Sequence, residues 1–583
     1  MHRRTFLKYG SAGLFTLGMG GFLRHAYSQT APQDESLLRD RVDPCFDNSP
    51  RVAPFTVPLA FAPVIDAVGA VQLTEARGEH VFVPGFRTPI WGYEGMFPGP
   101  TLVARRNVPV AVTFTNALPP GEDPSGIIIP NNSRQDPVDH PFRDSTTVVH
   151  LHGINTDGQL GPGGDGSFSS DGYPEGALSL KNPGESRTHQ YPNNGTPGQA
   201  APIYQRPATL WYHDHSVHIT SVHLYRGLSG FYVLKDVAEE ASGLPGSAAA
   251  DPGRGIEAGP LGFDVPLVVK DVMLAPEEID GRPRGTLIYN NCSHFGAFGD
   301  LMTVNGKQQP FFEVANRKYR FRLLNGSDSR QYLFAFRVAQ NLKSGPNEPF
   351  RYIGTDQGLL FTGVPEITTF FHANISERHE FVLDFSKYPI GTRIVMVNLL
   401  VDQNDERLFP IMEFRVTRVE ADHSQADAWP AAAWAHPADV QPAAITRTFR
   451  FNRQGGYWSI NSMQFDPLRD DAQPLLDTTE DWVLVNESGG WGHPVHLHLG
   501  RFKIMKIQGR APNPGELTGF KDTVWVGPNQ TITVRHQFWN FPGRFVFHCH
   551  NGSHEDSDMM SQFNVLPNPG TVGTGTLPGG TPS

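Results

Sequence analysis

Short runs in which apolar and polar residues alternate place the strongest constraint on the fold of this chain. Three of them are "VPVAVTFTNAL" (residues 108–118), "HEFVLDF" (379–385) and "QTITVRHQF" (530–538). A side-chain period of two is typical of a β-strand with one buried face. Glycine, proline and asparagine separate the runs, which favours turns at those points. The pattern predicts an all-β protein built of β-sandwiches or Greek-key barrels.

Two small, polar segments rich in alanine, glycine and proline divide the chain into pieces of domain size. They span residues 239–260 and 421–444, and a domain commonly takes about 100–200 residues. We therefore expect three consecutive β-barrel domains, at residues 45–238, 261–420 and 445–566. The last residues, 567–583, have low complexity and are expected to be disordered.

The first 28 residues have the features of an export signal. Arg3 and Arg4 precede "TFLK" and a weakly hydrophobic, glycine-rich stretch, and "AYS" at residues 26–28 suits a cleavage site. The pattern is typical of twin-arginine export, with a Sec-type leader as the alternative, and predicts a periplasmic or secreted protein. An oxidising compartment would allow Cys45 and Cys292 to form a disulfide, and two unpaired cysteines are the alternative.

Charge and hydrophobicity narrow the range of partners. The net charge of −11 argues against nucleic acid as a partner. No apolar run of about 18 residues follows the leader, so we expect no membrane span in the mature chain. A monomer is expected because three domains can already enclose a site.

Four pairs of histidines, each with one residue between them, are the strongest functional signal. They are His150/His152, His213/His215, His496/His498 and His548/His550. Residues i and i+2 of a strand point to the same face, so each pair presents two imidazoles side by side. A single pair would suit an exposed polar strand, and roughly one pair is expected by chance at this composition. Four pairs in apolar surroundings indicate eight metal-binding imidazoles, which suit a cluster of three ions.

The last pair encloses a cysteine, Cys549, which should face the opposite side of the strand. It can therefore bind a different metal ion, a short covalent path from the cluster. A cysteine, two histidines and a weak axial methionine are the ligands of a blue copper site, and the candidates are His493, Cys549, His554 and Met559. Zinc would more often take further cysteines, and the three cysteines of the chain are too few for an iron–sulfur cluster.

Together these motifs resemble those of the multicopper oxidase family, over essentially the whole mature chain. The resemblance implies three cupredoxin-like Greek-key barrels and four copper ions: one type 1, one type 2 and two type 3. It assigns His150 and His496 to the type 2 copper, and His493, Cys549, His554 and axial Met559 to the type 1 copper. The remaining six cluster histidines match the type 3 pair: His152, His213, His215, His498, His548 and His550.

The resemblance also implies the reaction. Family members take single electrons from a donor at the type 1 copper and reduce O2 to water at the trinuclear cluster. "HEDSDMM" (residues 554–560) and the segment at 299–332 resemble spore-coat laccases and bilirubin oxidases. Trp491 resembles bilirubin oxidases in particular, with ordinary packing beside the copper as the alternative. The implied donors are phenols, aromatic amines and bilirubin-like pyrroles.

Three further residues are implicated by the same resemblance. His554 would receive the electrons, because its counterpart in the family reaches the surface. Glu555 matches a proton-relay glutamate and Asp171 an aspartate near the type 2 copper. A structural charge and a turn residue, respectively, are the alternatives for these two. The glycine-rich insertion at 158–170 departs from the family pattern, and a longer surface loop is one interpretation of it.

Other functions are kept as alternatives. A metal oxidase could act on Mn(II), Fe(II) or Cu(I), although the 11 methionines do not cluster as they often do in cuprous oxidases. An exported structural protein that merely binds copper is the alternative outside enzymes, and the complete ligand set argues against it. A copper nitrite reductase would have two domains and fewer cluster imidazoles.

Overall fold

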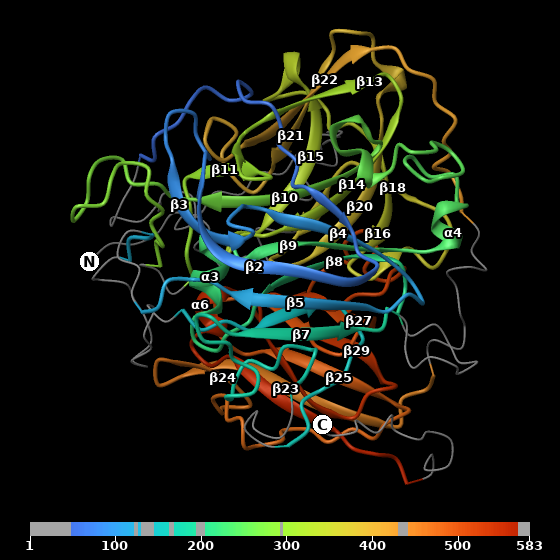
Figure 1. The fold of residues 1–583 in the computed structure, drawn as a ribbon. Helices are drawn as coiled ribbons and strands as arrows, with labels where there is room; N and C mark the ends of the chain where they lie inside the picture. Colours follow the sequence, from blue (N-terminus) through green and yellow to red (C-terminus); the bar gives the residue numbers. More distant parts are fainter. Residues whose placement is uncertain are drawn as a thin grey trace, which may run out of the picture.

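The structure is a computed structural model that describes residues 48–121, 126–129, 145–161, 168–193, 205–291, 295–429 and 441–569. These ranges form β-strands with a few short helices (Figure 1). The predicted export signal, Cys45, Cys292 and the tail beyond residue 569 lie outside them. Within the described ranges, no helix is both long enough and apolar enough to cross a membrane.

The first part of the chain forms two sheets, with the strand orders β1-β4-β9-β8-β6 and β3-β2-β5-β7. Strand β5 shows the predicted alternation, since Val110, Val112 and Phe114 are fully buried while the residues between them are half-buried. The strands are β1 Val64–Asp66, β2 Gly69–His80, β3 Thr88–Tyr93, β4 Gly99–Arg105, β5 Val110–Asn116, β6 Val149–His152, β7 Ser186–Tyr191, β8 Ala208–Asp214 and β9 Ser229–Lys235.

The middle part also forms two sheets. Their orders are β12-β11-β10-β14-β20-β16-β17, with β18 beside β16, and β13-β22-β21-β15-β19. The strands are β10 Asp264–Val272, β11 Leu301–Val304, β12 Lys307–Gln308, β13 Phe311–Ala315, β14 Lys318–Asn325, β15 Tyr332–Val338, β16 Phe350–Thr355, β17 Gly358–Leu359, β18 Glu366–Thr368, β19 Phe371–Ala373, β20 Arg378–Asp384, β21 Arg393–Asn398 and β22 Pro410–Arg418.

The third part repeats the arrangement with the orders β24-β23-β25-β29-β27 and β28-β26-β30-β31. Its strands are β23 Ile445–Gln454, β24 Tyr457–Ile460, β25 Thr478–Asn486, β26 His493–Leu497, β27 Phe502–Gln508, β28 Thr523–Val526, β29 Thr531–Phe538, β30 Gly543–Cys549 and β31 Met560–Val565. In all three parts, strands distant in sequence are neighbours in a sheet, as in Greek-key barrels. The predicted all-β fold of three consecutive barrels is confirmed.

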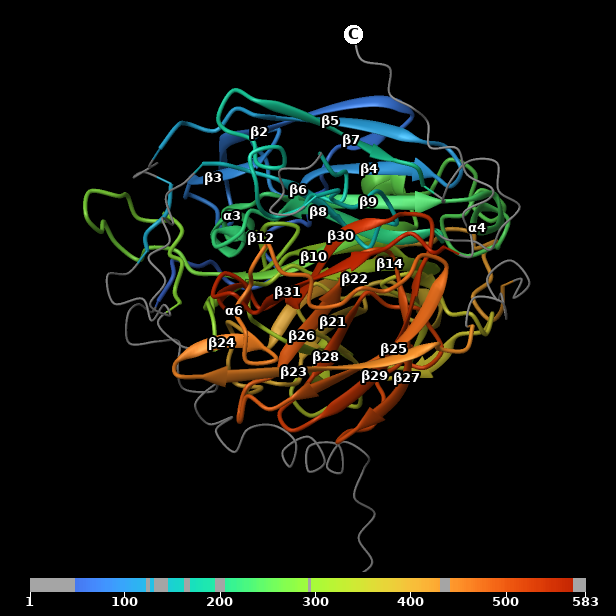
Figure 2. The same cartoon turned by 90° about the horizontal axis from the view of Figure 1, so that it is seen from below.

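Each part has its own apolar core, and the parts are packed against one another. The cores include Phe114 in the first part, Phe381 in the middle part and Trp482 in the third. Figure 2 shows β6 and β8 of the first part lying next to β30 of the third. The short helices are α3 Thr220–Arg226, α4 Val237–Glu240, η2 Ile256–Leu261, η3 Ala339–Asn341, η4 Phe385–Lys387 and α6 Gly552–Glu555.

The segment 239–260, predicted as a linker, is closely packed in the structure. Leu244 is fully buried in the middle core, and Glu239 forms ion pairs with Arg320 and Arg322. Its small, polar composition does not reveal these contacts, because they depend on partners in β14.

Candidate metal centres

Four strands bring the eight paired histidines together between the first and third parts. In the first part β6 pairs with β8, so that His150 lies opposite His213. In the third part β26 pairs with β30, so that His496 lies opposite His548. Each of the eight imidazoles is at most 2% exposed. Strand pairing therefore places all eight at one buried interface.

The eight histidines form two separate groups of three and a remaining pair, and His152 also lies within 4.8 Å of that pair. The ligand atoms of His152, His213 and His550 lie within 4.8 Å of one another, as do those of His215, His498 and His548. The remaining two face each other, with His150 Nε2 3.4 Å from His496 Nε2. Each of the three sets draws on both the first and the third part, so neither part can build a complete site alone.

Oxygen atoms around the rings determine which nitrogen of each histidine faces inward. Nδ1 of His150 donates to the Asp171 carbonyl (2.6 Å) and that of His496 to the Asp522 carbonyl (2.8 Å). Nδ1 of His213 donates to the Asp214 carbonyl at 2.7 Å. Each of these bonds leaves Nε2 with a free lone pair that points toward the other histidines.

His152 is turned the opposite way. Its Nε2 lies 3.0 Å from Oδ1 of Asp522 and 3.1 Å from Oγ1 of Thr523, and its Nδ1 has no partner among the residues that the structure describes. This ring therefore presents Nδ1 to His213 and His550, whose Nε2 atoms are also buried and unpartnered. Three unpaired nitrogens meeting in a buried site would be costly unless something binds them.

The donor geometry fits metal ions. Nε2 of His215 and Nε2 of His548 are 3.1 Å apart. Two nitrogens about 2.0–2.1 Å from a shared ion would have such a separation at an angle of about 100°. Imidazole is a preferred ligand of copper. The residues present therefore fit the copper that the sequence motifs imply.

Metal binding requires neutral imidazoles, and burial favours the neutral form of His150, His213, His215 and His498. Burial holds the pKa of His150, His213 and His498 well below the ordinary value, with neighbouring imidazoles acting in the same direction. Burial lowers the pKa of His215 to about 4, although the Glu555 carboxylate opposes the shift. The lone pairs are consequently available at neutral pH.

A second centre lies on the other side of β30, around Cys549. Its Sγ is 3.3 Å from Nδ1 of His493 and 3.5 Å from Nδ1 of His554. Met559 is fully buried in the same apolar core, and its carbonyl accepts a hydrogen bond from the Cys549 amide. Burial raises the pKa of the Cys549 thiol well above its usual value, so the thiolate needs a nearby cation. Ser488 Oγ lies 2.7 Å from His493 Nε2 and orients that ring.

The expectation that His554 reaches the surface is wrong for this chain. His554 is 1% exposed, and the ring of Trp458 lies over it with 3.8 Å between centroids. Trp458 is itself buried and packs edge-on against Trp491 at 5.4 Å. Arg453 lies over both tryptophan rings, 5.0 and 5.5 Å from their centroids. These aromatic side chains separate the Cys549 centre from solvent.

Two buried carboxylates adjoin the eight histidines. Oε2 of Glu555 lies 3.3 Å from Nδ1 of His548, and Oε1 lies 3.7 Å from Nε2 of His215. Within the described part of the chain, neither Glu555 oxygen has a hydrogen-bond partner. Oδ2 of Asp171 accepts a hydrogen bond from Nδ1 of His498 at 2.8 Å. Burial, reinforced by Asp157, raises the pKa of Asp171 well above its usual value.

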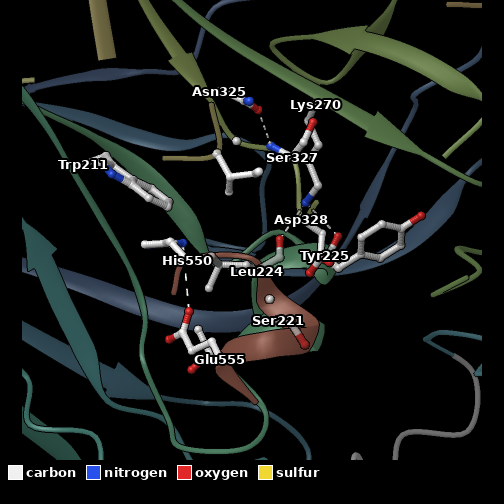
Figure 3. Close-up of a pocket in the computed structure, with 14 residues that line it drawn as sticks. Trp211, Ser221, Leu224, Tyr225, Lys270, Asn325, Ser327, Asp328, His550 and Glu555 are labelled. Carbon is white, nitrogen blue, oxygen red and sulfur yellow. Dashed lines mark hydrogen bonds and ion pairs between the residues drawn. The ribbon is translucent and has the colours of Figure 1, made fainter. Parts of the chain in front are cut away.

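A small pocket borders Glu555 between α3, α6 and the middle part (Figure 3). Its volume is about 20 Å³, enough for one ordered water molecule. His550 and Glu555 lie at one end, and Lys270 and Asp328 at the other. Burial lowers the pKa of Lys270 to about 7 and raises that of Asp328 to about 6. Polar groups thus surround a space next to the histidine cluster.

The glycine-rich insertion begins against the third part of the chain. The amide of Gln159 donates to the Arg544 carbonyl at 3.0 Å, and the Arg544 amide donates back at 2.8 Å. A side chain at Gly158 would meet the Phe545 ring at 2.5 Å. The start of the insertion therefore packs closely against β30; residues 162–167 lie outside the described residues.

Residues that orient the ligands were not identified from the sequence. Asp522 contacts two cluster histidines, Ser488 contacts His493, and Trp458 covers His554. No motif marks them: Asp522 and Trp458 meet their histidines only after the strands have assembled, and Ser488 lies five residues before His493 in the turn-like segment between two strands.

Comparisons with known proteins agree with this geometry. Residues 434–569 match the family model described as multicopper oxidase. The chain is 32% identical to a bilirubin oxidase of Albifimbria verrucaria over 554 residues, covering 90% of this chain and 83% of that protein. It is 30% identical to a laccase of Bacillus subtilis (strain 168) over 520 residues, covering 82% and 90%.

A solved structure shares the fold. The multi-copper oxidase from Pediococcus acidilactici superposes with a TM-score of 0.69 at 23% identity, covering 92% of this chain and 98% of that one. The predicted resemblance to bilirubin oxidases and laccases is thereby confirmed. With 32% identity to a relative over most of both sequences, this chain belongs to the multicopper oxidase family, whose members couple copper-dependent oxidation of a donor to reduction of O2.

Proposed function

We propose that this enzyme holds four copper ions at the two centres. His493, Cys549 and His554, with Met559 as a weak axial ligand, would hold the type 1 copper. His150 and His496 would hold the type 2 copper. The two groups of three histidines would hold the type 3 pair: His152, His213 and His550 for one ion, and His215, His498 and His548 for the other. The bound copper would supply one-electron chemistry, from the donor at the first centre to O2 at the second.

One observation carries this proposal: the inward nitrogens of eight buried histidines converge in three sets, each drawn from two domains. A structural patch of histidines would not need several unpartnered buried nitrogens. Cys549 also lies between two cluster histidines in the chain, so a short covalent path joins the two centres.

Two carboxylates are suited to handle the protons that O2 reduction consumes. We propose that Glu555 holds a proton at Oε2, next to His548, and passes it inward. The neighbouring pocket could hold the water that returns a proton to Glu555. Asp171 accepts a hydrogen bond from His498 and has a raised pKa, which suits a carboxyl group that exchanges protons.

We propose phenols, aromatic amines or bilirubin-like pyrroles as donors. Because Trp458 covers His554, a donor would dock outside this tryptophan, beside Trp491 and Arg453. Flat aromatic donors suit such a surface, since they stack on tryptophan and guanidinium groups. Twin-arginine export to the periplasm or beyond, and a monomeric state, are further parts of the proposal that rest on the sequence alone.

The test is oxygen uptake by the copper-loaded protein, with copper counted per chain. Bilirubin, a methoxyphenol, an aminophenol and Mn(II) are offered as separate donors, with C549S as the inactive control. Uptake with an organic donor and about four coppers per chain would support the proposal. Uptake with Mn(II) alone would favour the metal-oxidase alternative, and bound copper without uptake would favour a copper-binding structural protein.

A further inference from the structure

The middle domain supplies none of the candidate copper ligands, yet one of its arginines reaches the cluster region. Arg378, the first residue of β20, is fully buried. Its NH1 donates to Oδ1 of Asp522 at 2.8 Å, and its NH2 donates to Oδ2 of the same carboxylate. This two-pronged contact fixes both the position and the plane of the Asp522 carboxylate, which a lysine could not do.

Asp522 in turn contacts two cluster histidines. Its Oδ1 lies 3.0 Å from Nε2 of His152, and its carbonyl accepts from Nδ1 of His496 at 2.8 Å. The side chain of Gln357, also from the middle domain, donates to Oδ2 at 2.7 Å. Every oxygen of Asp522 is thus engaged, and the carboxylate has one orientation that satisfies all of its partners.

The contact with Asp522 explains why His152 is turned the opposite way. A ring held at Nε2 must present Nδ1 to His213 and His550. If the carboxylate moved, the His152 ring could flip and withdraw its donor atom from that group of three. The ring orientation of this ligand therefore depends on a carboxylate from the third domain, which an arginine of the middle domain holds, together with the neighbouring hydroxyl of Thr523.

Arg378 is itself held rigidly. Its Nε donates to the Thr209 carbonyl at 2.9 Å, on β8, the strand that carries His213. Its amide donates to Oδ1 of Asp356 at 2.9 Å, and Oδ2 of Asp356 accepts from the Asp522 amide at 3.3 Å. The arginine is consequently tied to all three domains at the point where they meet.

We propose that Arg378 is a positioning residue for the trinuclear centre: by fixing the Asp522 carboxylate, it selects the His152 ring orientation that presents Nδ1 to His213 and His550. This inference rests on the copper sites proposed above. It gives the middle domain a part in building a site to which it contributes no ligand.

The test compares R378M and R378K with R317M. Arg317 is a matched control, because it is equally buried and pairs with the Asp251 carboxylate but contacts no candidate ligand. Copper per chain, the blue absorption of the Cys549 centre and the electron paramagnetic resonance of the remaining copper are recorded for each protein. A structure of R378M shows the His152 ring directly.

We expect R378M to keep the blue absorption and to bind trinuclear copper roughly 10–100-fold more weakly, as is typical when a group that orients a metal ligand is removed. R378K should lose less copper affinity than R378M, since a lysine keeps the positive charge but cannot donate to both Asp522 carboxylate oxygens from two nitrogens. R317M should match the wild type in both centres. If R378M and R378K bind copper and give spectra as the wild type does, this inference is overturned but the proposed function is not. The same holds if R317M loses as much trinuclear copper as R378M. A wild-type chain that binds no trinuclear copper would overturn the proposed function as well.

Discussion

Acid sensitivity of the copper-free protein follows directly from the buried histidines. Burial is the main cause that lowers the pKa of eight of the ten histidines at the two centres: His150, His152, His213, His215, His493, His496, His498 and His550. In the unfolded chain a histidine titrates near pH 6.5. Below about this pH the unfolded chain binds more protons than the folded chain at these eight positions, so their contribution to stability falls as the pH falls. The raised pKa values of buried carboxyl groups such as Asp171 and Asp328 act in the opposite direction.

The magnitude can be worked out from linkage. Between about pH 6 and 5, each imidazole that stays neutral when folded lowers the unfolding free energy by slightly more than ~1 kcal/mol. Eight of them would cost about 10 kcal/mol together, which is comparable to the whole stability of an ordinary domain, about 5–15 kcal/mol. We therefore expect the copper-free protein to unfold in this interval. Copper should bind the assembled ligand sets of the folded state more tightly than the unfolded chain, and should therefore keep the loaded protein folded there.

The assay is urea unfolding of the copper-free protein at several values between about pH 7 and 5. H213Q removes one of the eight imidazoles. It should therefore reduce the number of protons taken up on unfolding by about one, and the unfolding free energy of the copper-free protein should fall less steeply as the pH falls. H423Q, at an exposed position, is the matched control and should leave the slope unchanged. A wild-type slope of fewer than about two protons, or a steeper slope for H213Q, would refute the reasoning.

Four further substitutions test the two centres. C549S should abolish the intense absorption near ~600 nm that a thiolate–copper site gives, and a mutant that stays blue would refute the ligand assignment. M559L should raise the potential of the type 1 copper in a redox titration, because a weak thioether ligand is lost; an unchanged or lower potential would contradict this. E555Q should slow O2 reduction by about 100-fold, while a donor should still remove the blue absorption of the type 1 copper quickly in the absence of O2. Equal slowing of both steps would argue against a role of Glu555 in proton transfer. W458A should lower the unfolding free energy, measured by denaturant unfolding, by about 3–5 kcal/mol. It should also expose His554 to donors, so that bulky phenols remove the blue absorption faster. Slower loss of the blue absorption would instead indicate that electrons pass through the tryptophan.

The ligands could be predicted from sequence because their geometry is local. Two residues apart on a strand, His548 and His550 must share a face, and Cys549 between them must face the other way. The structure has this arrangement, with Cys549 Sγ beside His493 and the two histidines in different groups of three. Only the alternation of one strand is needed for the inference, and neighbours elsewhere in the chain do not alter it.

The surroundings of the ligands could not be predicted in the same way. Arg378 and Asp522 are separated by 144 residues and lie in different domains, so no spacing connects them. The burial of His554 likewise depends on Trp458, which arrives from β24 and covers the ring. Such contacts are set by how the barrels pack, which strand periodicity does not encode.

Strand register is what keeps the two centres apart. In the pairing of β26 with β30, His496 lies opposite His548 and Val495 lies opposite Cys549. A slip of one residue in β30 would turn Cys549 toward the histidine cluster and both flanking histidines toward the core. Phe545 and Phe547, which alternate with Val546 and His548 on the same strand, are fully buried in the third core. Such a slip would also move both aromatic rings out of that core, so the packing that stabilises the barrel also keeps Cys549 on the opposite face of β30 from His548 and His550.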